Sequence, residues 1–348
     1  MPALCAEGRL AGMSTPVHDA GAEAAGKRAA AVADAASAPL QLGRAVVRVG
    51  TSSWTDPTLL EPGVFYPPSA HTPETRLNYY ASQFSVVEVD SSYYALPSRR
   101  NSELWVERTP DGFQFDIKAH ALMTGQPSEV KRLPGDLKAA LPKELGEKSR
   151  IYAKDLPPEL RSQVWTRFRE AIEPLHEAKK LGAVMLQYPR WFVPSDENRV
   201  ELEEAAERLE GLPCAVEFRS ALWFEGTAAA STLRLLKDVG LSFVMVDEPQ
   251  GMKSSVPPIV AVTEQRLAVV RMHGRRADAW EKSGIPVVER FRYLYSEQEL
   301  GEWVTRIIEA AKEAREVHVL MNNCYANYGT TNALEFAAMV REAYGVGK

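Results

Sequence analysis

Charged residues occur in pairs, two positions apart, at the ends of several short apolar runs. The pairs are Glu88 with Asp90, Asp116 with Lys118, Glu217 with Arg219, and Arg271 with His273. Residues two apart on a β-strand point to the same face, so each pair could face one interior. A buried charge is costly unless it is paired or used. The spacing predicts either a network of ion pairs, such as Glu217 with Arg271, or a site that uses these groups.

Proton transfer is the chemistry that these residue types favour. His273 ends its apolar run, and the unperturbed pKa of histidine, about 6.5, suits a general acid–base. We predict His273, Glu217 and Asp247 as catalytic residues. His318 instead begins its run, so we expect it at the opposite end, in a stabilising role. The residues that we predict to contact a substrate are Trp54, Glu88, Asp90, Tyr93, Lys118, Gln187, Arg219, Arg271, Arg275, Asn322 and Asn323.

Two other functions stay open at this point. The first is a metal-dependent phosphoester hydrolase, because carboxylates and imidazole bind divalent metals. Its ligands would be Glu88, Glu217, Asp247 and His273. The chain has no HExxH spacing, so we assign no metal ligand and no cofactor, with a divalent metal left open. The second is a non-catalytic small-ligand binding protein, which needs no proton-transfer pair.

Two segments favour an anionic substrate, such as a sugar phosphate. HGRR spans 273–276, and Gly329 and Thr330 stand just before an expected helix start. Backbone N–H groups at a helix N-terminus bind anions, and many barrels bind phosphate in the loops after strands seven and eight. The alternative is that Gly329 only makes a turn, while Arg275 and Arg276 are solvated.

Eight short apolar runs would position these residues. They span 45–50, 85–90, 113–118, 182–188, 214–219, 241–247, 267–273 and 317–323. Near-continuous Val, Leu, Ile, Met and Phe are typical of parallel strands covered on both faces. We predict an α/β fold, a (β/α)8 TIM barrel, in which the polar run ends form the ligand-binding mouth. The alternative is an open doubly wound sheet, but the chain has neither GxGxxG after the first run nor a P-loop.

Helical patterns separate most of the runs. Thr72 and Pro73 begin one helix, and Ser296 and Glu299 form the capping-box pattern of another. The other expected helices span about 160–180, 196–210 and 228–239. Residues 248–266 have little helical character, and residues from about 124 to 160 indicate an irregular insertion.

The overall composition limits the partners. The net charge of -5 argues against a general nucleic-acid or anionic-membrane binder. No apolar run approaches the ~20 residues of a membrane span. We predict a disordered Ala/Gly-rich extension over residues 1–44, followed by one barrel domain over 45–345. Widely spaced cysteines suit a reducing cytosol, so we expect a cytoplasmic protein with a small-molecule substrate; the oligomeric state stays open.

An ordered series of motifs resembles the YecE-like family, catalogued as domain of unknown function 72. The motifs are VGTSSW (49–54), FYP (65–67), VEVDSSYYALP (87–97), Trp105 with TPDGFQFDIKA (109–119), LGAVMLQYP (181–189), VEFRSALW (216–223), VRMHGR (270–275), RYLYSEQELGEW (292–303) and MNNCYANYGTTNA (321–333). The resemblance implies a TIM barrel related to sugar isomerases and implies no established reaction. This chain departs from the family pattern at Ser53, where Gly is usual, at Asp90, where Asn is common, and at Cys324.

Overall fold

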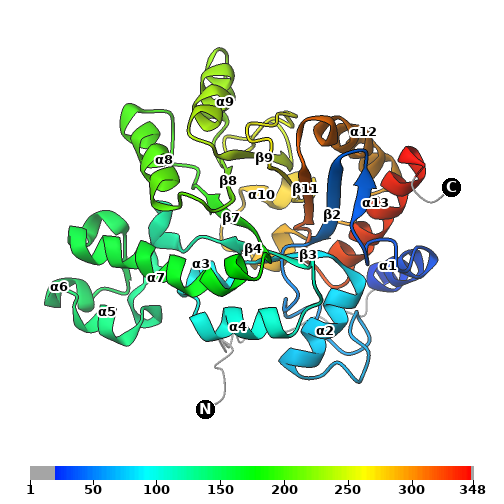
Figure 1. The fold of residues 1–348 in the computed structure, drawn as a ribbon, viewed down its shortest axis with the longest axis horizontal. Coiled ribbons are helices and arrows are strands. Elements are labelled where there is room, and N and C mark those ends of the chain that lie inside the picture. The colour runs from blue at the N-terminus through cyan, green and yellow to red at the C-terminus, as the bar shows by residue number, and fades with distance from the viewer. Residues whose placement is uncertain (1–19, 346–348) are drawn as a thin grey trace.

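The computed structural model describes residues 20–345, which fold around a closed barrel of parallel strands (Figure 1). The barrel strands are β2 (Ala45–Thr51), β3 (Val86–Val89), β4 (Gln114–Lys118), β7 (Leu181–Gln187), β8 (Cys214–Glu217), β9 (Ser242–Asp247), β10 (Leu267–Met272) and β11 (Glu316–Met321). Their order is β2-β11-β10-β9-β8-β7-β4-β3, and pairing of Thr51 with Val87 closes the ring. Each of the eight predicted runs therefore forms a strand, and the barrel is confirmed over an open sheet.

The strands are buried because helices cover one face and the barrel interior covers the other. Every residue of β8, β9 and β10 is buried. The apolar side chains that produced the continuous hydrophobic runs pack on both faces, as expected for parallel strands between two layers. The polar residues fall at the strand ends and among the interior positions, so the barrel centre is partly charged.

Helices follow most strands and pack outside the barrel. The longer ones are α2 (Pro73–Gln83), α4 (Arg99–Glu107), α7 (Pro158–Glu177), α8 (Asp196–Arg208), α9 (Ala228–Asp238), α12 (Glu297–Glu313) and α13 (Tyr328–Tyr344). The predicted capping box begins α12, because Ser296 Oγ accepts from the Glu299 N–H at 3.3 Å and Glu299 Oε2 accepts from the Ser296 N–H at 2.8 Å. Residues 248–266 form no helix, as predicted.

Short elements fill the connections. They are α3 (Ser91–Tyr94), η4 (Ala221–Phe224), α10 (Ala277–Trp280) and α11 (Val287–Arg290). The long segment between β4 and α7 holds η1 (Ala121–Met123), β5 (Ser128–Glu129), η2 (Val130–Arg132), α5 (Gly135–Ala139), α6 (Lys143–Gly146), β6 (Arg150–Ile151) and η3 (Ala153–Asp155). In Figure 1, α5 and α6 lie at one edge of the molecule, beside α7. Leu137 and Ile151 are buried, so this insertion is anchored to the barrel core.

Part of the predicted N-terminal extension is folded, which corrects the boundary placed at residue 44. Helix α1 (Ala20–Ala31) packs beside α13, and β1 (Leu40–Leu42) pairs antiparallel with β2. Arg28 donates to both carboxylate oxygens of Glu335 at 2.6 and 2.7 Å. Alanine has the highest helix propensity, and Ala25 is fully buried, so the composition that suggested disorder instead lets the helix approach closely. Residues 1–19 of the predicted extension lie outside the described residues.

Candidate functional site

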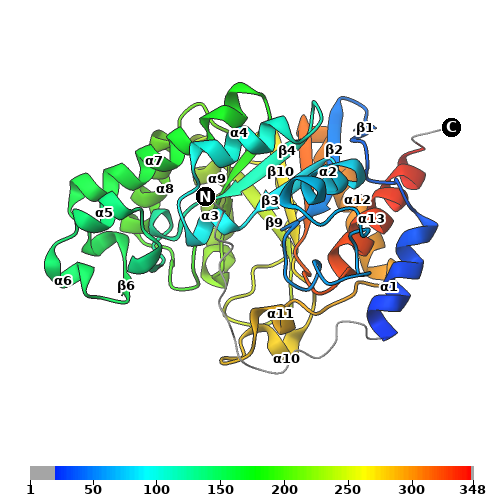
Figure 2. The same ribbon diagram turned by 90° about the horizontal axis from the view of Figure 1, so that it is seen from below.

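A cavity of about 550 Å³ lies at the C-terminal ends of the barrel strands. We call it the mouth cavity. Its predicted substrate-contacting residues are Asp90, Tyr93, Lys118, Gln187, Arg219, Arg271 and Asn322. Figure 2 shows α10 and α11 beyond the strands, where the loop after β10 covers this end. This volume falls within the range of small-molecule sites. The end of the barrel predicted to bind a ligand therefore contains a cavity of suitable size.

The floor of the mouth cavity is a buried ion-pair network around Arg271. Its Nε and Nη2 donate to the two oxygens of Glu88, both at 2.8 Å, and its Nη1 donates to Glu217. Arg219 and Gln187 also donate to Glu217, at 3.2 and 2.7 Å. Burial raises the pKa of Glu217, but Arg271 and His273 outweigh it and hold that pKa well below its usual range. The network of ion pairs that the sequence predicted as one alternative is therefore present, and it forms the floor of the mouth cavity.

His273 lies beneath the cavity wall and does not line the cavity. The residue is 1% exposed, and its ring lies 5.8 Å from Trp280 and 6.2 Å from Phe291, measured between centroids. Its Nδ1 lies 2.7 Å from Asn322 Nδ2, and its Nε2 lies 3.2 Å from Glu217 Oε1. Burial lowers the pKa of His273 to about 4, so the imidazole is neutral. His273 therefore lies beside Asn322 and Glu217 and outside the cavity lining, and its predicted acid–base role stays a prediction.

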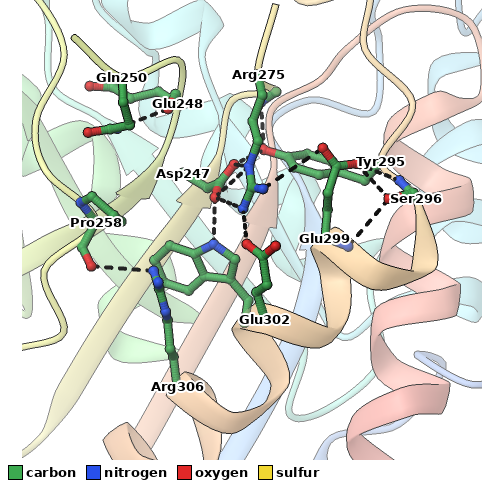
Figure 3. Close-up of polar contacts among 12 residues, drawn as sticks. Asp247, Glu248, Gln250, Pro258, Arg275, Tyr295, Ser296, Glu299, Glu302 and Arg306 are labelled. Carbon is green, nitrogen blue, oxygen red and sulfur yellow. Dashed lines mark hydrogen bonds and ion pairs between the residues drawn. The ribbon is translucent and has the colours of Figure 1, made fainter.

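Asp247 belongs to a separate cluster on the outer side of the barrel wall (Figure 3). It accepts hydrogen bonds from Tyr295 Oη at 2.7 Å and Trp303 Nε1 at 2.6 Å. Arg275 donates to both of its oxygens, at 2.9 and 2.8 Å, and also to Glu302 of α12. Both carboxylate oxygens of Asp247 therefore accept hydrogen bonds from neighbouring side chains. Strand alternation turns this side chain toward α12. The predicted catalytic Asp247 and the predicted substrate-binding Arg275 thus pair with each other outside the mouth cavity.

The neighbouring acid, Glu248, points to the barrel side and was missed by the sequence prediction. It accepts from Arg219 Nη1 at 2.9 Å and from the Val256 N–H at 2.6 Å, and it is 2% exposed. Burial raises the pKa of Glu248 to about 8, outweighing Arg219. Adjacent strand residues face opposite sides, so the usable signal was that only one acid of the pair Asp247–Glu248 could face inward.

Three further predictions are corrected by the packing. Trp54 is buried in the core, with its ring 6.0 Å from Trp105 and 6.4 Å from Phe115. Asn323 donates to the carbonyl of Tyr293 and to Asn332, both at 2.8 Å, and so holds a loop. Gly329 and Thr330 lie inside the first turn of α13, which begins at Tyr328, and neither lines the mouth cavity. The helix start predicted to bind an anion therefore lies apart from the mouth cavity, and Gly329 and Thr330 line a separate small pocket.

Lys118 and Asp90 are the titratable groups that face the cavity from neighbouring strand ends. Lys118 Nζ lies 4.9 Å from the centroid of the Tyr93 ring and makes no hydrogen bond or ion pair with any residue in 20–345. Burial and the positive charge of Arg271 lower the pKa of Lys118, outweighing Glu88, Glu217 and Asp90. Burial raises the pKa of Asp90, outweighing Lys118. In both groups, burial therefore favours the uncharged form.

The insertion supplies one side of the cavity. Tyr93 Oη donates to Gln126 Oε1 at 2.8 Å, and Gln126 Nε2 donates to the Gln187 carbonyl at 2.9 Å. These bonds hold the Tyr93 ring beside Lys118. Gln126 lies in an irregular segment without periodicity, so the sequence carried no signal for its role.

Basic and aromatic residues from the loops complete the rim. The lining residues that the sequence prediction missed include Gln126, Arg190, Trp191, Lys282, Arg290 and Phe291. Arg290 donates to the carbonyls of Ala279 and Lys282, and within residues 20–345 no carboxylate pairs with it. Trp280 Nε1 is buried without a hydrogen-bond partner among the described residues. The acidic lining residues are only Asp90 and Glu281, so the cavity favours an anion.

The four residues of the metal-hydrolase alternative do not converge. Glu88 and Glu217 point at Arg271, whereas Asp247 is held by Arg275 in the outer cluster. Over residues 20–345, no group of three or more His, Cys, Asp or Glu side chains is placed to hold a metal ion. Over the same residues, no helix is both long and apolar enough to cross a membrane.

Comparison with known proteins gives one consistent family. The family described as "Protein of unknown function DUF72" matches residues 48–346. The UPF0759 protein YunF of Bacillus subtilis (strain 168) is 31% identical over 281 residues, which cover 80% of this chain and 89% of that protein. Two crystal structures of DUF72 family proteins are similar. That from Thermotoga maritima MSB8 has a TM-score of 0.67 at 30% identity, covering 85% of this chain and 99% of that chain. That from Enterococcus faecalis V583 has a TM-score of 0.65 at 26% identity, covering 86% and 98%.

Proposed function

The chain belongs to the DUF72 family, and we propose that it is an enzyme that binds a small anionic, polar molecule in the mouth cavity and transfers protons on it. Lys118 and Asp90 would be the proton-transferring groups. The single observation that carries the proposal is that these two titratable side chains face one cavity whose charged lining residues are mostly basic. Neither the predicted catalytic His273 nor Asp247 reaches that cavity.

Proton transfer is fastest when the acid or base titrates near the working pH. Burial lowers the pKa of Lys118 and raises that of Asp90, which favours the uncharged form of each group. A neutral Lys118 amine can accept a proton from the substrate, and a protonated Asp90 carboxyl can donate one. Groups with such perturbed pKa values in a cleft are candidates for catalysis.

The remaining polar groups would bind and orient the substrate. Asn322 and Gln187 offer amide groups at the cavity wall, and the Trp280 indole N–H has a free hydrogen. Arg190, Lys282 and Arg290 at the rim would attract a carboxylate or phosphate. Arg271 already binds two carboxylates, so it would fix the floor and supply a positive field.

The test is ligand binding followed by solvent hydrogen exchange. A panel of sugar phosphates, sugar acids and small carboxylic acids would be screened by thermal shift, and the ligands that bind would be incubated in D₂O and followed by NMR. We expect deuterium uptake at one ligand carbon with the unmodified protein and a loss of at least ~100-fold in Lys118→Met and Asp90→Asn. Lys237→Met, on the exposed surface of α9, is the matched control.

The outcomes separate the candidate functions. Binding without deuterium uptake by any ligand would favour the non-catalytic binding protein. Deuterium uptake that survives in both variants would overturn the assignment of Lys118 and Asp90. Uptake that is lost only in His273→Asn would return the catalytic role to His273.

A further inference from the structure

Lys118 differs from the other cations of the mouth cavity in what its nitrogen contacts. Arg271 and Arg219 donate to carboxylates, and Arg290 donates to backbone carbonyls. The Lys118 nitrogen lies over the face of the Tyr93 ring and makes no hydrogen bond or ion pair with a residue in 20–345. A lysine that serves only to balance charge would be expected against a carboxylate, and both nearby glutamates of the floor are instead taken by Arg271.

The position of Lys118 also suits attack on a ligand. The residue ends β4, its side chain is only partly exposed, and it lines the cavity from the wall beside the floor. Tyr93 is held by Gln126, so the aliphatic stem and the nitrogen of Lys118 have a fixed neighbour on one side. Burial of the nitrogen, with the positive charge of Arg271, lowers the pKa of Lys118 against the opposing effect of Glu88 and Glu217, which favours the uncharged, nucleophilic amine.

We propose that Lys118 forms an imine with the carbonyl carbon of a small anionic ligand. The inference rests on the proposed function and names its substrate class: anions that carry an aldehyde or ketone, such as 2-oxo acids or open-chain sugar phosphates. The rim cations Arg190 and Arg290 would bind the anionic group, while the carbonyl end reaches Lys118.

The chemical step balances without a further reactant. The lone pair of the neutral amine forms a C–N bond to the carbonyl carbon, and the carbonyl π electrons move to oxygen. The oxygen then takes a proton from the attached nitrogen, which restores the nitrogen lone pair and gives a neutral carbinolamine. Asp90 then donates a proton to the hydroxyl of this carbinolamine, the C–O bond breaks, and water leaves with both electrons of that bond. The product is a protonated imine, C=N⁺H–, and an Asp90 carboxylate that can accept a proton from the adjacent ligand carbon.

Borohydride trapping with glyoxylate tests the proposal directly, because reduction of the imine leaves a carboxymethyl group on the lysine. The full chain would be incubated briefly with glyoxylate and cyanoborohydride, digested, and mapped by mass spectrometry. We expect Lys118 to be labelled at least ~10-fold faster than the exposed Lys237, because a desolvated lysine is the better nucleophile at neutral pH. The rate should fall in Asp90→Asn, and Lys118→Arg should retain its fold and lose the fast label.

Glycolate, an anion of similar size without a carbonyl, separates this proposal from the proposed function. Protection of Lys118 by glycolate together with fast labelling supports both. Binding of glycolate or other anions, by thermal shift, with Lys118 labelled no faster than Lys237 overturns the imine and leaves the anion-binding cavity standing. Fast labelling of Lys118 that no anion slows keeps the reactive lysine and overturns the anionic substrate class. Absence of both binding and fast labelling overturns both.

Discussion

Strand β4 carries two charges, two residues apart, that meet opposite environments. Asp116 lies deeper in the barrel, where each of its oxygens is 2.9 Å from His318 Nδ1. His318 Nε2 lies 3.2 Å from Glu316, and Glu316 also binds Arg48. Lys118, at the mouth, makes no hydrogen bond or ion pair within the described residues 20–345. The same strand therefore carries one buried charge, Asp116, that pairs with a neighbouring residue, and one charge, Lys118, that faces a cavity.

The difference distinguishes a charge that stabilises the fold from a charge that is available to a ligand. At the end of the barrel opposite the mouth, where the sequence predicts it, His318 is fully buried and faces Asp116 and Glu316. At the mouth, the incomplete partnering of Lys118 costs stability and leaves a group that a ligand can complete. Active sites commonly trade stability for function in this way, so the two ends should respond differently to mutation.

The largest effect is expected from removing Asp116. Asp116→Ala removes the fully buried partner of His318 and leaves it only the partly exposed Glu316 within residues 20–345, and breaking a buried pair costs about 3–5 kcal/mol in the free energy of unfolding. Urea denaturation measures it, with Asp238→Ala on the surface of α9 as control, for which a change within about 0.5 kcal/mol is expected. A loss below about 1 kcal/mol in Asp116→Ala would contradict the structural role of this pair.

The contacts of His318 with Asp116 and Glu316 should also make the free energy of unfolding depend on pH. Burial lowers the pKa of His318, but Asp116 and Glu316 outweigh it and raise that pKa to about 9. Because the folded pKa lies above the unfolded value of about 6.5, the stabilisation is complete below pH 6.5 and is lost as the pH rises toward 9, by on the order of 3 kcal/mol.

The measurement is the difference in unfolding free energy between the unmodified protein and His318→Gln across that pH range, which cancels the other titrating groups. The difference should shrink as the pH rises. If His318→Gln does not fold, NMR titration of His318 in the unmodified protein gives the pKa itself, and a value below about 6.5 would refute the assignment.

A smaller loss is expected from filling the space beside this pair. A Cβ on Gly182 of β7 would overlap Asp116 Oδ1 and lie 2.6 Å from Cε1 of His318. Gly182→Ala should therefore lower the free energy of unfolding by about 1–3 kcal/mol, measured by urea denaturation. Gly135→Ala in α5, where a Cβ meets nothing within 4 Å, is the matched control, and equal effects of the two would argue against this close packing.

The smallest effect on stability is expected at the mouth. Lys118→Met removes a poorly partnered buried amine, so the free energy of unfolding should stay unchanged or rise by up to about 1 kcal/mol. The same variant should lose ligand deuteration and glyoxylate labelling. A loss of more than about 2 kcal/mol would place Lys118 with the structural charges instead.

The sequence by itself determined the strands, most helices and the barrel, because these depend on local patterns. Continuous apolar runs, the Ser296–Glu299 capping box and the polar strand ends are each read over a few residues. The same alternation identified Lys118, Asp90 and Arg271 as residues of the mouth, and all three line the cavity.

Only the tertiary structure decided which of these charges is open to a ligand. The ion pairs join residues that are far apart in the chain. Arg271 pairs with Glu88 and Glu217, and Arg275 pairs with Asp247. Within residues 20–345, Lys118 is left without a hydrogen-bond acceptor. The turning of Asp247 outward and Glu248 inward depends on where the strand ends, and Gln126 reaches the site from an insertion without periodicity. A local pattern shows which residue types lie near the mouth. Whether each of their polar atoms finds a hydrogen-bond partner depends on residues from other strands, so only the assembled barrel decides it.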